Sequence, residues 1–142
     1  MQRGVTLVEL VVVLALIGAL VGWGIPRMSA GMDWLAVDTA AHEVASFYAT
    51  ARFAAARRGT RVRVEFAKDS LRAVFEGVRD SLFRVQAGPA RRRVTFRASK
   101  NVIRIGSSGY GWGASNTTLV FQRGLVAESL TTSRLGRMKW WR

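Results

Sequence analysis

The chain has 142 residues, 49% of them hydrophobic, which suits one small domain and one membrane segment. It contains no cysteine and a single histidine, His42, so disulfides, thiolate sites, cysteine nucleophiles and multi-histidine metal sites are excluded. The net charge of +13 favours contact with polyanions such as nucleic acid, anionic lipid or an acidic protein, although a generally basic, solvated surface would have the same composition.

The N-terminal region is dominated by an apolar run from Val5 to Ile25. As a helix rising about 1.5 Å per residue it would span roughly 31 Å, close to the ~30 Å hydrocarbon core of a bilayer. A cleaved secretory signal is too short to explain this run. A plain transmembrane anchor leaves Glu9 unexplained, because a carboxylate in a membrane helix costs about 2.5–3.5 kcal/mol.

Cleavage of the chain after Gly4 would explain how the Glu9 carboxylate is tolerated in an apolar helix. The new amine of Val5 would then lie one helical turn away and could neutralise the carboxylate, within one subunit or between neighbours. The stretch Arg3-Gly4, followed by Val5-Thr6-Leu7-Val8-Glu9-Leu10 and further apolar residues, resembles the type IV pilin and pseudopilin superfamily. The resemblance implies cleavage after Gly4 by a prepilin peptidase, methylation of Val5 and a role for Glu9 in assembly. The usual first mature residue in that family is phenylalanine, and Val5 departs from it.

Four segments are predicted along the chain: a leader at 1–4, a transmembrane half of the helix at 5–31, an amphipathic half at 32–59 and an antiparallel β domain at 60–142. Pro26 removes one helical hydrogen bond, so we expect a kink there, or the end of the membrane helix.

A second helical pattern runs from Asp33 to Arg58 and ends before Gly59. Its apolar residues recur at alternating steps of three and four, which predicts one stripe packed on a sheet. The stripe comprises Trp34, Val37, Ala41, Val44, Tyr48, Ala51 and Ala55. His42 lies beside the stripe and is interpreted as a solvated or hydrogen-bonded helix residue.

After Gly59 the period changes to the alternation of half-buried strands. Strands are predicted at 61–66, 71–75, 81–85, 93–97, 102–105, 118–122, 125–132 and 137–141. One long helix followed by short strands indicates an α+β, pilin-like fold, with the helix packed on antiparallel sheet. The glycine-rich segment 106–113 lacks the Gly-Lys-Ser/Thr ending of a phosphate-binding loop and is predicted to be a surface loop.

The C-terminal third has a narrower resemblance. Phe121-Gln122-Arg123-Gly124 and the segment from Ser133 to Lys139 resemble minor pseudopilins of the GspH/FimT type. Members of that group serve type II secretion, or assembly and DNA uptake by type IV pili.

A basic cluster near the C-terminus is the candidate DNA-binding site. Arginine and lysine neutralise phosphates, and aromatic faces stack on exposed bases. The cluster comprises Arg134, Gly136, Arg137, Lys139, Trp140 and Arg142, with Trp141 beside them. In FimT-like proteins a Gly-Arg-x-Arg element is implicated in DNA binding; Gly136 and Arg137 match it, and Lys139 replaces the second arginine. The alternative is a solvated basic strand whose tryptophans alternate between core and surface.

The sequence therefore predicts a structural subunit, not an enzyme, with no metal and no cofactor. It would be a single-pass inner-membrane protein with a periplasmic C-terminal domain, and part of a pseudopilus or pilus after assembly. Its expected partners are a prepilin peptidase, other pilins or pseudopilins, the inner membrane and, in the alternative function, DNA.

The leader assignment has a direct test. Substitution of Gly4 should block cleavage, because the peptidase reads that residue, and the full-length form should accumulate in the membrane. Mass spectrometry measures the outcome, and normal mass loss in the Gly4 variant would contradict the assignment.

Overall fold

The structure is a computed structural model that describes residues 6–77 and 79–141, except the side chains of residues 23–27. It separates into two compact units, Met1–Met32 and Asp33–Arg142. The predictions for Gly4, Val5 and Arg142 fall outside the described residues, as does the side chain of Pro26.

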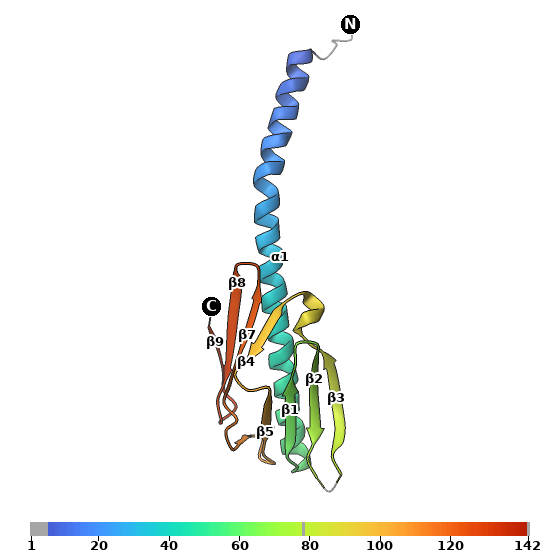
Figure 1. The fold of residues 1–142 in the computed structure, drawn as a ribbon, viewed down its shortest axis with the longest axis vertical. Coiled ribbons are helices and arrows are strands. Elements are labelled where there is room, and N and C mark those ends of the chain that lie inside the picture. Colours follow the sequence, from blue (N-terminus) through green and yellow to red (C-terminus); the bar gives the residue numbers. More distant parts are fainter. Residues whose placement is uncertain (1–5, 78, 142) are drawn as a thin grey trace. The chain divides into compact units, whose positions relative to one another are not determined.

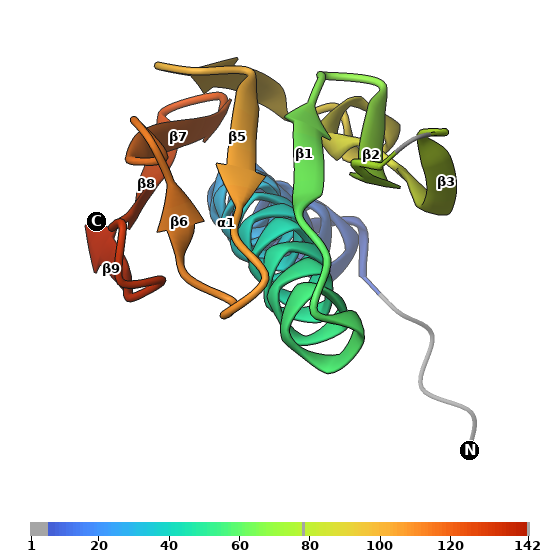
Figure 2. The same cartoon turned by 90° about the horizontal axis from the view of Figure 1, so that it is seen from below.

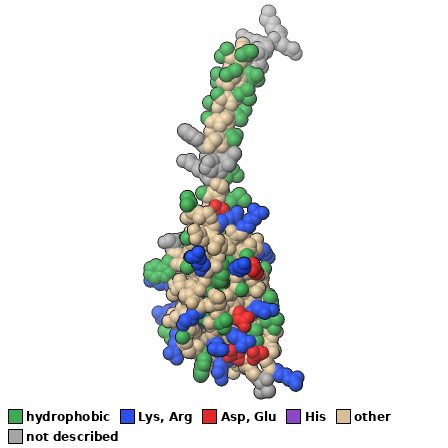
Figure 3. Space-filling model, in the orientation of Figure 1, with side chains coloured by type: hydrophobic (Ala, Val, Ile, Leu, Met, Phe, Trp, Pro, Cys, Tyr) green, Lys and Arg blue, Asp and Glu red, His purple; other side chains and the backbone are tan. Residues whose placement is uncertain are grey.

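Helix α1 spans Leu7–Arg58 (Figure 1). In the first unit all apolar side chains from Leu7 to Val21 are exposed, and Figure 3 shows many of them on one face. Within the described parts of the chain, no helix combines the length and apolarity that a membrane crossing requires.

The end of α1 is fixed by its local sequence. Gly59 has a φ of 62°, a left-handed conformation that glycine adopts without steric cost. Its N–H donates to the carbonyl of Ala56 at 3.4 Å, and the N–H of Thr60 donates to Ala55 at 3.2 Å. These two bonds form a Schellman motif, which satisfies carbonyls that the last turn would otherwise leave free.

The second unit has two antiparallel sheets, arranged around α1 in Figure 2. The first sheet has the order β3-β2-β1-β5-β6 and the second the order β4-β7-β8-β9. The strands are β1 (Val62–Phe66), β2 (Ser70–Phe75), β3 (Ser81–Ala87), β4 (Thr95–Ala98), β5 (Val102–Ile105), β6 (Gly111–Trp112), β7 (Thr117–Arg123), β8 (Val126–Thr132) and β9 (Met138–Trp141).

The predicted α+β fold class, a long helix packed on antiparallel sheet, is confirmed, and the predicted strands appear with shifted ends. Two short elements were missed: the 3-10 helix η1 at Pro89–Arg92 and strand β6. β6 pairs Trp112 with Arg104 of β5 inside the segment expected to be a loop. Such brief pairing depends on a distant strand and leaves almost no periodic signal in the sequence.

The core lies between α1 and the two sheets. Six of the seven stripe residues are buried, but the prediction was wrong for Trp34, which is 47% exposed. Trp34 sits in the first turn of the unit, before the buried part of the helix begins at Val37. Conversely Ala40 and Phe47 lie outside the predicted stripe and are fully buried, because sheets on two sides bury a wider face of the helix than one sheet would.

Ion pairs to Glu43 and Asp33 connect η1 and β7 to α1; one of them joins Arg91 to Glu43 at 3.6 Å. Arg92 of η1 donates to both carboxylate oxygens of Glu43, at 2.6 and 3.3 Å. The hydrogen bond from Arg92 holds the pKa of the Glu43 carboxyl below its ordinary value. Arg123 at the end of β7 pairs with Asp33 at 2.8 Å, and its other nitrogen donates to the carbonyl of Arg92 at 2.9 Å.

Candidate functional site

The first candidate site is the start of α1. The N–H of Glu9 donates to the hydroxyl of Thr6 at 3.3 Å, and the N–H of Leu10 donates to the Thr6 carbonyl at 3.2 Å. Thr6 is therefore the N-cap of the helix, and Glu9 occupies the third helical position. Threonine followed three residues later by glutamate is the spacing of a capping box, a signal that the sequence analysis missed.

This geometry gives Glu9 a local role besides the predicted one in assembly. A carboxylate in the first turn interacts favourably with the positive end of the helix dipole. The Thr6 hydroxyl also satisfies the N–H of Glu9, which would otherwise be unpaired at the helix start. The assembly role of Glu9 stays a prediction, since the structure contains a single chain.

The first unit has an exposed apolar surface. Leu7, Val8 and Leu20 are each at least 69% exposed, and the apolar residues between them are also exposed. A helix that is hydrophobic all round is stable only when it is buried, either in lipid or among other helices. The apolar side chains from Leu7 to Val21 therefore form a surface without a covering partner in the single chain.

The second candidate site is the basic turn between β8 and β9, residues 133–137. Ser133 and Arg137 close it, with the Ser133 N–H donating to the Arg137 carbonyl at 2.9 Å and the Arg137 N–H donating to the Ser133 hydroxyl at 3.1 Å. Gly136 has a φ of 75° and is buried, whereas Arg134 and Arg137 are exposed. The turn thus presents two arginines to solvent.

Arg52 of α1 anchors this turn, a function that the sequence analysis missed. Its guanidinium donates to the carbonyl of Gly136 at 2.8 Å and to the carbonyl of Gly109, in the glycine-rich loop, also at 2.8 Å. The planar guanidinium of arginine can serve two such carbonyls at once. An arginine among alanines on a helix was the available signal, but nothing near it in the sequence points to its partners.

Both C-terminal tryptophans already have partners within the chain. Trp140 is half-buried and stacks on His42, with ring centroids 4.6 Å apart. His42 is also hydrogen-bonded to the carbonyl of Asp38 at 2.9 Å, in line with its predicted role as a hydrogen-bonded helix residue. Trp141 is exposed, but the ammonium of Lys139 lies 3.9 Å from its ring centroid. Of the candidate DNA-binding residues, the structure brings Arg134, Gly136 and Arg137 together in one turn and packs Trp140 inward.

Six cations of the described residues lie within salt-bridge distance of a carboxylate: Arg63, Lys68, Arg91, Arg92, Arg104 and Arg123. Arg63 pairs with Glu65, Glu76 and Asp80, and Arg104 pairs with Glu76 at 2.9 Å. By contrast, Arg134 and Arg137 have no carboxylate within salt-bridge distance among the described residues. Across the described part of the chain, no group of three or more histidine, cysteine or acidic side chains is placed to hold a metal ion.

Known proteins resemble this chain both in its N-terminal sequence and in its fold. Residues 1–25 match the family described as the prokaryotic N-terminal methylation motif. Two crystal structures of the type IV minor pilin FimU from Pseudomonas aeruginosa, in space groups P21 and P65, have a similar fold, with TM-scores of 0.63 and 0.61. Both are 14% identical to this chain; they cover 75% and 74% of it, and 88% and 92% of their own chains. No curated protein sequence matches the chain.

The chain therefore has a prokaryotic N-terminal methylation motif at residues 1–25 and an α+β fold similar to that of a type IV minor pilin. The two matches support a type IV pilin or pseudopilin, as the sequence analysis predicted.

A pair of glycine substitutions tests the anchored turn. A Cβ at position 136 would overlap the guanidinium of Arg52, whereas a Cβ at Gly113 would meet nothing within 4 Å. Both glycines have a positive φ, so Gly113→Ala should cost only the backbone strain of about 1–2 kcal/mol. Gly136→Ala should lower the free energy of unfolding by a further ~1–3 kcal/mol, because Arg52 must be displaced.

Denaturant unfolding of the two variants against the natural sequence measures this difference. Equal losses would show that Arg52 does not hold the turn.

Proposed function

We propose that the chain is a structural minor pilin-like subunit of the GspH/FimT type, which assembles into a type II secretion pseudopilus or a type IV pilus. The observation that carries the proposal is the methylation motif on a helix whose apolar surface is exposed in the single chain, followed by a pilin-like α+β domain. Prepilin peptidase would remove residues 1–4. The chain would wait as a single-pass inner-membrane protein with its second unit in the periplasm.

The capped helix start suits this role. After cleavage, Val5 would carry the new amine next to the cap residue Thr6. Glu9 lies in the first helical turn, where its carboxylate can meet the amine of the same or a neighbouring subunit. In a medium of low dielectric constant, burying an unpaired carboxylate costs much more free energy than burying one paired with a cation. This difference would favour the alignment of neighbouring helices in which each Glu9 carboxylate meets an amine.

Glu9→Gln separates the two roles of this residue. Glutamine also serves at the third position of a capping box, so the helix start should persist, but the charge is lost. We expect normal processing by the peptidase and loss of the subunit from sheared filaments, measured by immunoblotting.

Thr6→Ala is the matched variant, because it removes the cap and keeps the charge. It should retain more assembly than Glu9→Gln. Full incorporation of the Glu9→Gln subunit would argue against pairing of the carboxylate with an amine.

A second candidate function is DNA binding at the basic turn. Its support is that Arg134 and Arg137 are exposed and have no carboxylate partner within the described chain. Because Trp140 stacks on His42 and Lys139 covers one face of Trp141, the expected contacts are with phosphates rather than stacked bases. Binding should therefore be independent of DNA sequence and weaken steeply with salt.

Arg137→Ala tests this function in a fragment that begins at Met32. It should weaken duplex DNA binding equally across sequences and reduce the slope of log affinity against log salt by ~0.9. The control is Arg104→Ala, which removes the same charge from a residue paired with Glu76. Mobility-shift assays over a salt series measure the affinity and its salt dependence for both variants. Equal effects of the two variants would show that binding depends on the total charge of the protein and not on the basic turn.

A further inference from the structure

An open hollow of about 180 Å³ lies between the last turns of α1 and the strands β2 and β3. Its lining is mostly apolar and includes Phe53 and Ala54 of α1, Phe75 at the end of β2 and Phe83 of β3. The rings of Phe75 and Phe83 lie against each other, with centroids 4.8 Å apart. Phe53 is 67% exposed. Three elements of the second unit therefore each contribute one phenylalanine to the same small hollow.

Two arginines of the last helical turn, Arg57 and Arg58, complete the lining. The guanidinium of Arg58 lies over the Phe75 ring, 4.4 Å from its centroid, so its positive charge is held at the hollow itself. Neither arginine has a carboxylate within salt-bridge distance among the described residues. Their N–H groups can therefore serve a planar acceptor such as a carboxylate from outside the chain.

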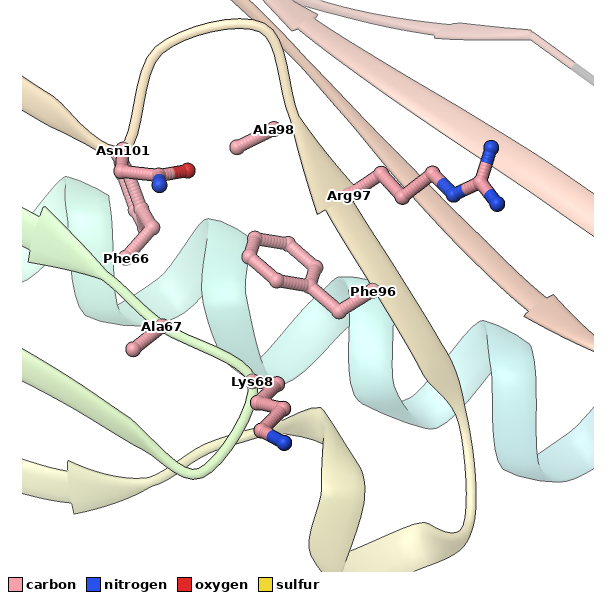
Figure 4. A pocket seen from close by; sticks show the side chains of 7 residues that line it. All are labelled: Phe66, Ala67, Lys68, Phe96, Arg97, Ala98 and Asn101. Atoms are coloured by element: carbon pink, nitrogen blue, oxygen red, sulfur yellow. The ribbon is translucent and has the colours of Figure 1, made fainter.

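A larger hollow of about 560 Å³ beside β4 does not combine these features (Figure 4). Figure 4 shows the Arg97 side chain directed away from the space. The N–H of Phe66 donates to the carbonyl of Asn101 at 2.7 Å, and the N–H of Ala90 donates to the carbonyl of Lys68 at 2.9 Å. These backbone bonds close both ends of the hollow, so it has little room for another chain.

A third hollow, of about 280 Å³, shares Phe53 with the first. Its other lining residues include Ala49 and Ala56 of α1 and Gly109 of the glycine-rich loop, so Phe53 is its single aromatic wall among the described residues. Its cation, Arg52, already donates to two glycine carbonyls. The hollow at Phe75 and Phe83 is thus distinguished by several aromatic walls and by arginines without a carboxylate partner.

The size of this hollow fits one aromatic ring. A cavity of ~150 Å³ accommodates one benzene molecule, and aromatic pairs attract each other beyond the apolar area that they bury. Sites for free small molecules are typically larger, ~300–1,000 Å³, because they must bury most of the ligand. A hollow of about 180 Å³ instead suits a single anchoring side chain of a protein that makes further contacts outside it.

The lining also distinguishes a phenyl ring from a nucleobase. A base carries polar edge atoms, and their burial is costly unless they are hydrogen-bonded. The uncharged polar side chain in the described lining is Thr50, whose hydroxyl already donates to the carbonyl of Ser46 at 2.9 Å. A phenyl ring needs no such partner. The positive charge at the rim then favours carboxylates beside that ring.

We propose that this hollow binds an aromatic side chain of a partner protein, and that an acidic residue next to it in the partner's sequence pairs with Arg57 or Arg58. Contact with the three phenylalanines supplies affinity, and the arginines supply the preference for acidic sequence. The surface lies outside the capped helix start and the basic turn, and the proposal stands whether or not the chain assembles into a filament.

The test uses the full chain in non-ionic detergent micelles and a synthetic peptide with blocked ends, in which one phenylalanine is flanked by two glutamates. An NMR titration should shift the ring resonances of Phe53, Phe75 and Phe83. Replacement of the peptide's phenylalanine by alanine should weaken binding about tenfold or more, because the buried ring is lost. Replacement of its glutamates by lysines should abolish binding.

Filling the hollow tests its role as the binding site. Ala54→Leu adds a side chain within the hollow and should weaken the phenylalanine peptide about tenfold or more, since the ring and the leucine compete for one space. The matched control is Ala49→Leu, which makes the same change at an exposed position of the same helix, in the third hollow, and should leave affinity unchanged.

A charge reversal tests the role of the arginines. Arg58→Glu should lose the acidic peptide and bind the lysine-substituted peptide better than the natural protein does. The control is Arg72→Glu, because Arg72 is exposed and alternation along β2 places it on the face opposite Phe75. At ~0.15 M salt this distant charge is largely screened, so the control should keep the affinity of the natural protein.

Four outcomes would overturn the proposal. These are no binding of the phenylalanine peptide, equal binding of the alanine peptide, equal affinities of Ala54→Leu and Ala49→Leu, and displacement of the peptide by oligothymidine that shifts the same three rings, which would assign the hollow to nucleobases. If Ala54→Leu does not fold, the Arg58→Glu charge exchange still decides the question. Failure of these tests would leave the leader and filament predictions untouched.

Discussion

The second unit depends on the burial of one broad face of α1 between two sheets. Four alanines, Ala40, Ala41, Ala51 and Ala55, are fully buried on this face, so the strands approach the helix closely. Phe47 and Tyr48 are also fully buried, and burial of a side chain like that of Phe47 contributes about 1.5–3 kcal/mol. A close-packed interface tolerates added volume poorly, which makes the small residues as important as the large ones.

The surface features follow from this packing. Because α1 is held against both sheets, Arg52 can reach two glycine carbonyls from loops distant in sequence and hold the turn that carries Arg134 and Arg137. The same packing brings His42 under Trp140 and removes that tryptophan from the set of residues available to a ligand. The basic C-terminus is therefore a positioned turn of arginines rather than an aromatic stacking platform.

The first unit leaves an apolar surface around its helix uncovered in the single chain, from Leu7 to Val21. A helix that is hydrophobic all round is stable only when that surface is buried against other apolar groups. In the second unit, the arginines of the turn at 133–137 have no carboxylate within salt-bridge distance among the described residues.

The sequence alone determined the features that depend on residues close together in the chain, namely the ends of the helix and the type of each secondary-structure element. Thr6 and Glu9 encode the helix start, Gly59 encodes its end, and apolar periods of 3.6 and 2 distinguish helix from strands, because these signals act over about four residues. The tertiary structure decided the rest: the burial of Phe47, the exposure of Trp34, the stacking of Trp140 on His42 and the role of Arg52. These depend on which segments meet, and the partners of Arg52 lie 57 and 84 residues from it, a separation at which local pattern carries no information.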